Sequence, residues 1–349
     1  MDTSGCKGAG ADMGLFDWLR KREEATPGAE AVAPQLVREA TDYLVRQTDP
    51  RLALCARHYE RLAPGIEATI RHIVTGVRSL PEPCDAHPEH WASSPELAAF
   101  FVSADDLTTA FSRSEPLQRL FDDNPVLDVA YATLATTLIE RKGLGMAMEG
   151  EILRRDVVQT SVSFTNPRVQ LVASEPDELR RAIAYRMFEE LAMVALERIE
   201  ALRSERKQLS DDRALLQTRL QMLHGHGTGF DVQHVEDADG LQARMEENTR
   251  ALAAAGAGVD ALERELDVVI GVLQSSADLV TIHQRTMRLT AMNLLVEGQS
   301  SEAVREIRFG CAHAERIRPL TRAVLLVRYP RSGMRKVTMS FAEASRLPI

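Results

Sequence analysis

The 349-residue chain is long enough for two or three domains, and its low aromatic content of 5% favours long helices over β-sandwiches or barrels. A net charge of −9 disfavours non-specific nucleic-acid binding by most of the molecule, although residues 301–349 carry ten basic and four acidic groups. Four scattered cysteines are too few for a disulfide framework, and no apolar run approaches the roughly 20 residues that span a bilayer. We therefore expect a cytoplasmic protein. Its excess of arginine over lysine is typical of a GC-rich bacterial genome.

Residues 1–34 are expected to form a flexible N-terminal segment and linker, because glycine, alanine and proline are frequent there. Met13 opens a stretch that is typical of a natural start of a bacterial protein. Translation therefore begins at either Met1 or Met13, and the sequence leaves both alternatives open.

Residues 35–153 predict an α-helical domain. Helical periodicity runs through 50–80, where Pro64 and Gly65 are expected to end one helix and begin another. A further helix is predicted over 125–142, between an Asn-Pro pair and a glycine.

Residues 154–173 change to strand character. Valines are frequent there, and Asn166-Pro167 separates two short runs of β-forming residues. This pattern predicts a small β-hairpin inserted between helical segments.

Two heptad ladders, on Tyr185–Leu223 and Leu241–Leu294, predict a long antiparallel coiled-coil helical hairpin over residues 174–300. The expected oligomer seam consists of leucines at heptad positions: Leu202, Leu209, Leu216, Leu223, Leu252, Leu262, Leu266 and Leu273. Asn248 is expected to fix the register. His283 is expected either to be satisfied by a neighbouring polar group or to lie near a break in the seam. The alternative is that His283, stacked against its symmetry mate, makes assembly sensitive to pH.

Residues 301–349 predict a basic C-terminal helix followed by a β-hairpin. The candidate interaction residues share a basic turn: Arg328, Tyr329, Arg331, Arg335 and Lys336. Such a turn can contact phosphates while the aromatic ring stacks on a base. Contact with an acidic protein surface and simple solvation are the two alternatives.

The spacing Cys-x-x-His occurs twice, at Cys55/His58 and at Cys84/His87. Two thiolates and two imidazoles are a common tetrahedral ligand set for zinc. The alternative is that the cysteines are core residues of helices and the histidines lie in a loop, with no metal bound. No nucleophile is paired with a base, and no phosphate-binding loop occurs. We therefore predict no metal, no cofactor and no catalytic residue.

The sequence as a whole predicts a mainly α fold: a helical domain, a small β-hairpin insert, a coiled-coil helical hairpin and a short C-terminal β-hairpin. We expect a non-enzymatic interaction or scaffold protein that forms homo-oligomers. It would bind a protein partner through the N-terminal helical domain or the C-terminal hairpin. One alternative is a signalling component whose helices couple an N-terminal ligand or metal site to the basic tail. The other is a protein that uses this tail to bind nucleic acid or an anionic membrane.

Overall fold

The structure is a computed structural model that describes residues 32–149, 152–225, 232–256, 259–296, 303–317 and 320–335. The chain divides into two compact units, each built from separate stretches of sequence. Among the described residues, the sheet unit comprises 71–188 and 280–335, and the helical unit comprises 32–70 and 189–279. None of the described helices is both long and apolar enough to cross a membrane.

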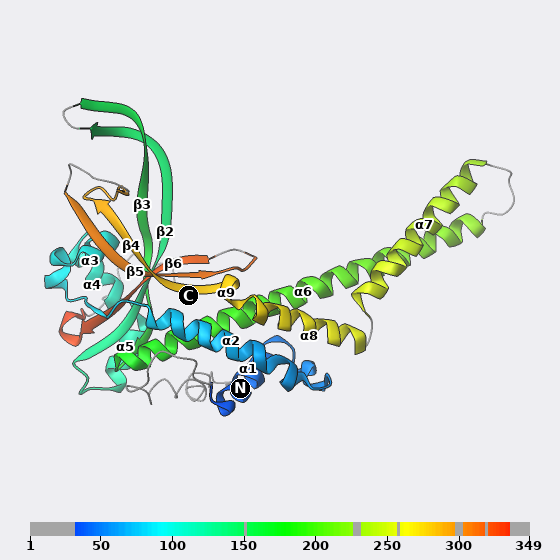
Figure 1. The fold of residues 1–349 in the computed structure, drawn as a ribbon, viewed down its shortest axis with the longest axis horizontal. Coiled ribbons are helices and arrows are strands. Elements are labelled where there is room, and N and C mark those ends of the chain that lie inside the picture. The colour runs from blue at the N-terminus through cyan, green and yellow to red at the C-terminus, as the bar shows by residue number, and fades with distance from the viewer. Residues whose placement is uncertain are drawn as a thin grey trace, which may run out of the picture. The chain divides into compact units, whose positions relative to one another are not determined.

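The sheet unit is organised around a sheet that curls into a half-barrel (Figure 1). Its described strands are β1 (Cys84–Asp85), β2 (Val129–Glu149), β3 (Ile152–Ala173), β4 (Val280–Thr290), β5 (Val304–Ala314) and β6 (Leu320–Pro330). Five of them are antiparallel in the order β3-β2-β6-β5-β4, and β1 pairs in parallel with the end of β6. The strands β3 and β4 are therefore the edges of the described sheet.

Short helices connect the sheet's first strands: η3 (Pro88–Ser93), α3 (Pro95–Phe100), α4 (Ala104–Ser112) and α5 (Glu115–Asp123). The hydroxyls of Ser94, Ser103 and Ser114 each accept a hydrogen bond from the third amide of the following helix. These caps satisfy amides that have no partner within a helix, which allows such short helices to start where they do. In addition, α4 and α5 contact β3, while α3 contacts β5.

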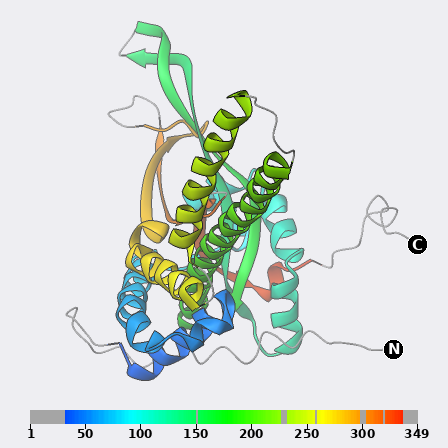
Figure 2. The same cartoon turned by 90° about the vertical axis from the view of Figure 1, so that its right-hand side faces the viewer.

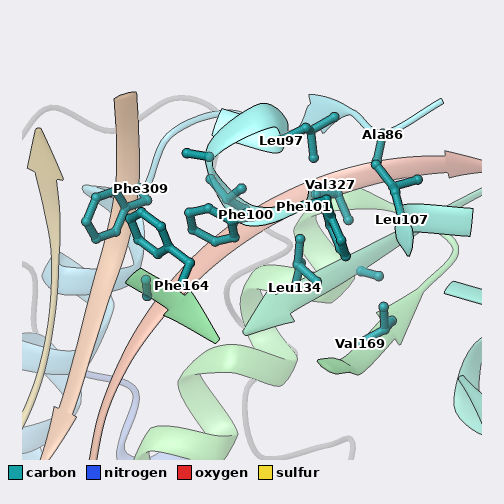
Figure 3. Packing of buried hydrophobic residues seen from close by; sticks show 14 of the residues in the cluster. Ala86, Leu97, Phe100, Phe101, Leu107, Leu134, Phe164, Val169, Phe309 and Val327 are labelled. Carbon is teal, nitrogen blue, oxygen red and sulfur yellow. The ribbon is translucent and has the colours of Figure 1, made fainter. Parts of the chain in front are cut away.

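Aromatic residues fill the space between these helices and the sheet (Figure 3). Phe100 stacks on Phe164 with ring centroids 4.4 Å apart, and Phe309 meets Phe164 edge-on at 5.6 Å. Phe111 of α4 stacks on Tyr329 of β6 with centroids 4.2 Å apart. Burial of these rings contributes to holding the helices on the sheet.

The helical unit contains α1 (Pro34–Thr48), η2 (Pro50–Leu54), α7 (Val232–Ala255), α8 (Val259–Gln274) and α9 (Ser276–Leu279). Two longer helices, α2 (His58–Arg78) and α6 (Pro176–Gly225), contribute residues to both units. The far part of α6 runs beside α7 in the opposite direction (Figure 2), and the Asn248 side-chain amide donates to the Leu209 carbonyl at 3.0 Å. The last short helix, η4 (Arg331–Gly333), belongs to the sheet unit.

The predicted mainly α fold class is wrong, because the chain builds a large antiparallel sheet. The helix expected over 125–142 is strand β2. Residues Ala130–Thr136 are all buried except Tyr131, which is half-buried. Both faces of this part of the strand are therefore covered. The sequence of a strand that is covered on both sides is a continuous run of apolar and small residues and does not alternate with polar ones. Such a run cannot be distinguished from a helical segment by its periodicity.

The predicted coiled coil is also wrong, because its second ladder does not form one helix. The helix α7 ends at Ala255, before Gly256, whose φ of 79° is accessible mainly to glycine. From Val280 the chain is strand β4, in which His283 is exposed. Apolar residues recur here at three- and four-residue steps by chance. The heptad interpretation therefore gave too little weight to the β-branched residues, which favour a strand.

The predicted β-hairpin over 154–173 is instead part of one long strand, β3, which pairs with β2. Asn166, with a φ of 54°, and Pro167 lie at a register shift within this strand. Pro64 lies inside α2 and does not end a helix. The helix expected at the start of residues 301–349 is also wrong, because Val304–Ala314 form strand β5, which pairs with β4 and β6. The first strand of the expected C-terminal hairpin is β6, whereas residues 336–349 lie outside the described residues.

Candidate functional site

The predicted interaction residue Tyr329 is fully buried, with 0% exposure. Its hydroxyl donates to the Gly333 carbonyl at 2.7 Å, and its ring stacks on Phe111. In this conformation the ring has no free face for a nucleic-acid base. Tyr329 therefore supports the core rather than a ligand surface.

Arg331 caps the end of α5 rather than facing a partner. Its guanidinium donates to the carbonyls of Phe121 and Leu127, both at 2.8 Å, and to that of Asn124. The same guanidinium lies 4.7 Å from the Phe121 ring centroid, in cation–π geometry. The turn after β6 thereby holds α5 in place.

Arg335 anchors the end of the described chain to α4. Its backbone amide donates to Ser112 Oγ at 3.0 Å, and its guanidinium pairs with the exposed Asp105 carboxylate. Arg328 is exposed on β6, and Lys336 lies outside the described residues. A binding role for Arg328 and Lys336 stays a prediction.

The predicted seam leucines are covered to very different extents within one chain. Leu266 and Leu273 are fully buried, at 0% and 1% exposure, and Leu216 is buried at 6%. The others are half-buried, namely Leu202, Leu209, Leu252 and Leu262, and the Leu223 side chain is not among those described. A Cβ added at Gly65 would come within 2.8 Å of the Leu273 Cβ, so α2 and α8 pack closely around this leucine. Homo-oligomerisation stays a prediction.

The Cys55/His58/Cys84/His87 hypothesis gains no support from the geometry. Among the residues that the structure describes, no three His, Cys, Asp or Glu side chains are grouped closely enough to hold a metal ion. Burial raises the pKa of Cys84 to about 12, which favours the protonated thiol over the thiolate that binds metals. His87 Nδ1 instead accepts a hydrogen bond from the Glu89 amide.

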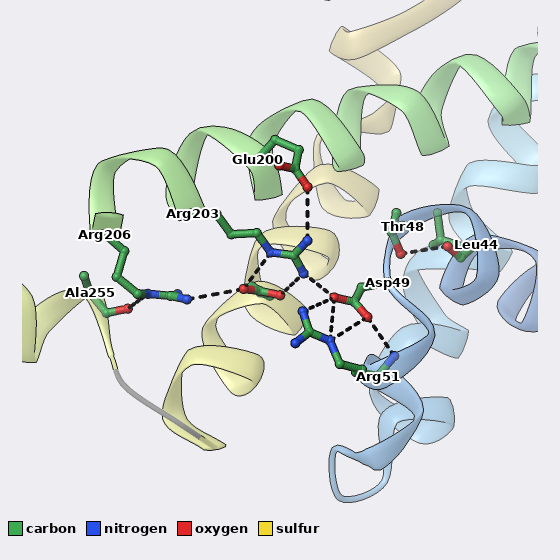
Figure 4. Close-up of polar contacts among 9 residues, drawn as sticks. Leu44, Thr48, Asp49, Arg51, Glu200, Arg203, Arg206 and Ala255 are labelled. Atoms are coloured by element: carbon green, nitrogen blue, oxygen red, sulfur yellow. Dashed lines mark hydrogen bonds and ion pairs between the residues drawn. The ribbon is translucent and has the colours of Figure 1, made fainter. Parts of the chain in front are cut away.

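A buried ion cluster ties three parts of the helical unit together (Figure 4). Arg203 of α6 donates to Glu265 of α8 at 2.6 and 3.1 Å and pairs with Asp49, which lies between α1 and η2. Both carboxylates are almost fully buried, with side-chain exposures of 4% and 7%. Arg206 adds a longer 3.4 Å contact to Glu265. Because an unpaired buried charge is costly, this cluster fixes the relative positions of α1, α6 and α8.

Lowering the pH is expected to weaken this cluster through Asp49. Hydrogen bonds from Arg51, together with the contact to Arg203, lower the pKa of Asp49 from 3.8 to about 2. A depressed carboxyl pKa contributes stability above about pH 4 that is lost as the pH falls through about 2. The stability advantage of the wild-type chain over Asp49→Asn should therefore shrink by about 2 kcal/mol between pH 5 and pH 2. Urea unfolding at a series of pH values measures this difference, and a constant difference would contradict the assignment.

An open cleft of about 840 Å³ lies in the sheet unit between α4, the start of α5 and strand β3. Its apolar lining includes the end of α3, the two residues that follow it and residues of β3: Phe100, Phe101, Val102, Phe164 and Val169. Figure 3 shows Phe100 beside Phe164, with Val169 further along the same strand. The side chains of Phe100, Phe101, Phe164 and Val169 are buried at 9% exposure or less, so they form a fixed floor.

Strand β3 presents its edge to this cleft. Successive side chains of a strand point to opposite faces, so a site that faces one side of a strand touches every second residue. Here four consecutive residues, 167–170, all line the cleft. Earlier along the same edge, Thr160 and Val162 form backbone hydrogen bonds with the segment 293–295, at 2.8 and 2.9 Å. The edge strand therefore already accepts added backbone in the described structure, and the cleft lies beyond that point.

The rim of the cleft carries charges of both signs. Asp106 and Arg113 come from α4 and its C-terminal end, Glu115 comes from α5, and Arg168 comes from β3; all four are exposed. Val102 beside them is 90% exposed. An apolar floor with a mixed polar rim resembles the make-up of protein-binding surfaces more than a pocket for a single anion.

No protein-family model, curated protein or solved structure matches the chain. The site therefore rests on its own geometry. Reasoning from the sequence missed this cleft, because the segments 100–116 and 164–170 meet only once the sheet has formed. The available signals were local, namely the serine caps of α4 and α5 and the Asn166-Pro167 pair in β3.

Proposed function

We propose that this chain is a non-enzymatic, cytoplasmic interaction protein that binds an extended segment of a protein partner in the cleft beside β3. The single observation that carries the proposal is the run of consecutive residues 167–170 along the cleft, which indicates an exposed strand edge. A peptide added to a sheet edge gains affinity from main-chain hydrogen bonds and specificity from pockets for alternate side chains. The cleft supplies both kinds of contact.

Each part of the cleft has a distinct role in this proposal. The floor formed by Phe100, Phe164 and Val169 receives apolar side chains that point toward the core. The opposite wall, α4, limits the depth of the groove and selects the size of the bound residues. The charges of Arg113 and Arg168 lie at the rim, where they influence partner choice more than affinity.

Selection from a library of random displayed decapeptides tests the proposal. We expect enrichment of peptides with apolar residues at every second position, because only that spacing places several side chains on the floor. The selection should use both the wild-type chain and a chain carrying Val337→Ser, Met339→Ser and Phe341→Ser. In this variant, the alternating apolar residues of the chain itself cannot compete with the library peptides for the cleft.

A blocked cleft provides the matched control. Thr109 is exposed on α4 and lines the cleft, so Thr109→Trp should fill the groove and reduce the affinity of a selected peptide at least tenfold. Thr75→Trp makes the same substitution at an exposed residue of α2 that does not line the cleft, and should leave the affinity unchanged. Isothermal titration calorimetry measures both. Failure of both selections, or equal peptide binding by Thr109→Trp, would overturn the proposal.

A further inference from the structure

We infer that the cleft selects its partner by the order of charges along the bound segment: a basic residue beside Asp106, an acidic residue beside Arg113 and an apolar residue between them. This inference rests on the proposed function, because it names the chemistry of the segment that binds the same strand edge. It is carried by the two charges on the cleft-lining face of α4 and by the antiparallel direction in which β3 accepts added backbone.

One face of α4 lines the cleft and carries opposite charges at its two ends. Asp106, Thr109, Ala110 and Arg113 all line the cleft, and residues three, four and seven positions apart lie on the same side of a helix. Arg113 directly follows α4 and keeps helical backbone angles, so this geometry extends to it. At about 1.5 Å per residue, Asp106 and Arg113 are about 10 Å apart along the helix axis. The wall of the cleft is therefore negative at one end and positive at the other.

Neighbouring groups leave this order of charges in place. The Asp106 carboxylate accepts a hydrogen bond from the Ser103 hydroxyl at 2.8 Å, and no cation pairs with it in the described part of the chain. Glu115, the other acidic residue that lines the cleft, pairs with Arg119 along α5, so its charge is partly offset there. Asp106 and Arg113 are both exposed, and side chains of a bound segment can reach them.

Strand β3 contributes its own charge to the opposite face of an added strand. Arg168 pairs in register with Ala135, and Val169 pairs with Leu134, so these two consecutive residues of β3 point to opposite faces. Val169 belongs to the floor, and Arg168 therefore lies on the other face. A segment added beside β3 presents one face to the floor and α4 and its other face to Arg168. The charges of α4 consequently act on the same face of the segment as the floor does.

The edge of β3 favours one direction for the added strand. Segment 293–295 already pairs with this edge, and the bridge between Ser161 and Leu294 is antiparallel. A bound segment that continues along the edge in the same direction keeps the antiparallel pattern, which is slightly more stable than the parallel one. A fixed direction converts two charges on α4 into a preference for one order of residues in the partner.

The spacing of the charges in the partner follows from strand geometry. Side chains of one face recur at every second residue, and four residues of extended strand span about 14 Å. A basic and an acidic residue four positions apart can therefore reach Asp106 and Arg113 through their flexible side chains. The residue midway between them points to the same face and meets the apolar floor.

Two synthetic peptides of identical composition test the inference: Val-Thr-Lys-Thr-Val-Thr-Glu-Thr-Val and Val-Thr-Glu-Thr-Val-Thr-Lys-Thr-Val. Both are acetylated and amidated, so that terminal charges do not contribute. We expect the wild-type chain to bind one of them about tenfold more tightly than the other at about 50 mM salt, because one order forms two opposite-charge pairs and the other forms two like-charge pairs. Raising the salt to about 1 M should reduce this ratio to about twofold. Isothermal titration calorimetry measures the affinities.

Exchanging the two charges of α4 should reverse the preference. Asp106→Arg with Arg113→Asp is expected to bind the other peptide more tightly, and the neutral pair Asp106→Asn with Arg113→Gln should bind both peptides equally. A distorted cleft would weaken both peptides, whereas the inference requires the exchanged variant to gain affinity for one of them. The matched control, Asp122→Arg with Arg328→Asp, exchanges charges at two exposed residues that do not line the cleft and should keep the wild-type preference.

The outcomes separate this inference from the proposed function. Equal affinity of the wild type for the two peptides, or a ratio that salt does not change, would overturn the inference while binding itself still supports the cleft. A wild-type preference that persists in the exchanged or the neutral variant would also overturn it. If the exchanged variant binds neither peptide, the neutral variant decides by the same criterion. If the wild type binds neither peptide although selected library peptides bind, the inference alone is wrong, and if the library peptides fail as well, the proposed function is wrong too.

Discussion

Replacing Arg203 with methionine is expected to lower the free energy of unfolding of the helical unit by about 3 kcal/mol. Arg203 bridges two carboxylates, Asp49 and Glu265, whose side chains are only 7% and 4% exposed. Removing one partner of a buried ion pair leaves the other charge without compensation, and this penalty exceeds the loss of the contact itself. We place the value at the lower end of the usual range because Arg51 and Arg206 still contact the two carboxylates.

The matched control is Arg51→Met. Arg51 also pairs with Asp49, at 2.7 Å, but its own side chain is 65% exposed. Solvent screens the Arg51 end of this pair, so we expect a smaller loss than for Arg203→Met. Urea unfolding followed by circular dichroism measures both variants. Equal losses for the two substitutions would show that burial of the cluster does not determine its contribution.

The sequence predicted the helices whose local signals are complete. The start of α4 has such a local signal, a serine followed three residues later by an aspartate, and the hydroxyl of Ser103 accepts a hydrogen bond from the Asp106 amide, as in an N-cap. The first long helix was also expected where α6 lies, and Asn248 was expected between α6 and α7, where it donates to Leu209. These features depend on residues that are close in sequence.

Strands whose environment is set by distant residues were not predicted. In β2 the pattern depends on cover from both faces of the sheet. In β4 it depends on pairing with residues of β5 that lie 14 to 34 positions later. The same limit applies to the candidate sites. Arg203 is not one of the apolar ladder residues of α6, and the fold brings Glu265 and Asp49 to it. A local pattern cannot reveal a partner 154 residues away.

Tyr329 illustrates why composition misleads at a functional site. Neighbouring arginines made it resemble a stacking residue at the tip of a basic turn, yet its ring lies in the core against Phe111. The arginines around it serve the fold as well, since Arg331 donates to carbonyl groups at the end of α5. The cleft, in contrast, contains no concentration of one residue type that would mark it in the sequence.

Replacing Phe111 with alanine is expected to cost about 3–5 kcal/mol in the free energy of unfolding of the sheet unit. Phe111 and Tyr329 are both 0% exposed, and their rings are nearly parallel with an interplanar angle of 8°. The substitution removes this stack and leaves a cavity between α4 and β6. Because α4 forms one wall of the cleft, peptide binding should weaken even at temperatures where the variant remains folded.

Two milder substitutions separate packing from polar contacts. Tyr329→Phe keeps the stacked rings and removes only the 2.7 Å hydrogen bond to the Gly333 carbonyl, so we expect a loss of about 1 kcal/mol. Thr109→Ala lies on the exposed side of α4 and should change stability by less than about 0.5 kcal/mol. Thermal unfolding gives the order of the three variants. If Phe111→Ala proves as stable as Tyr329→Phe, the stack does not anchor α4, and the wall of the cleft must be held by the contacts of Arg335 with Ser112 and Asp105 instead.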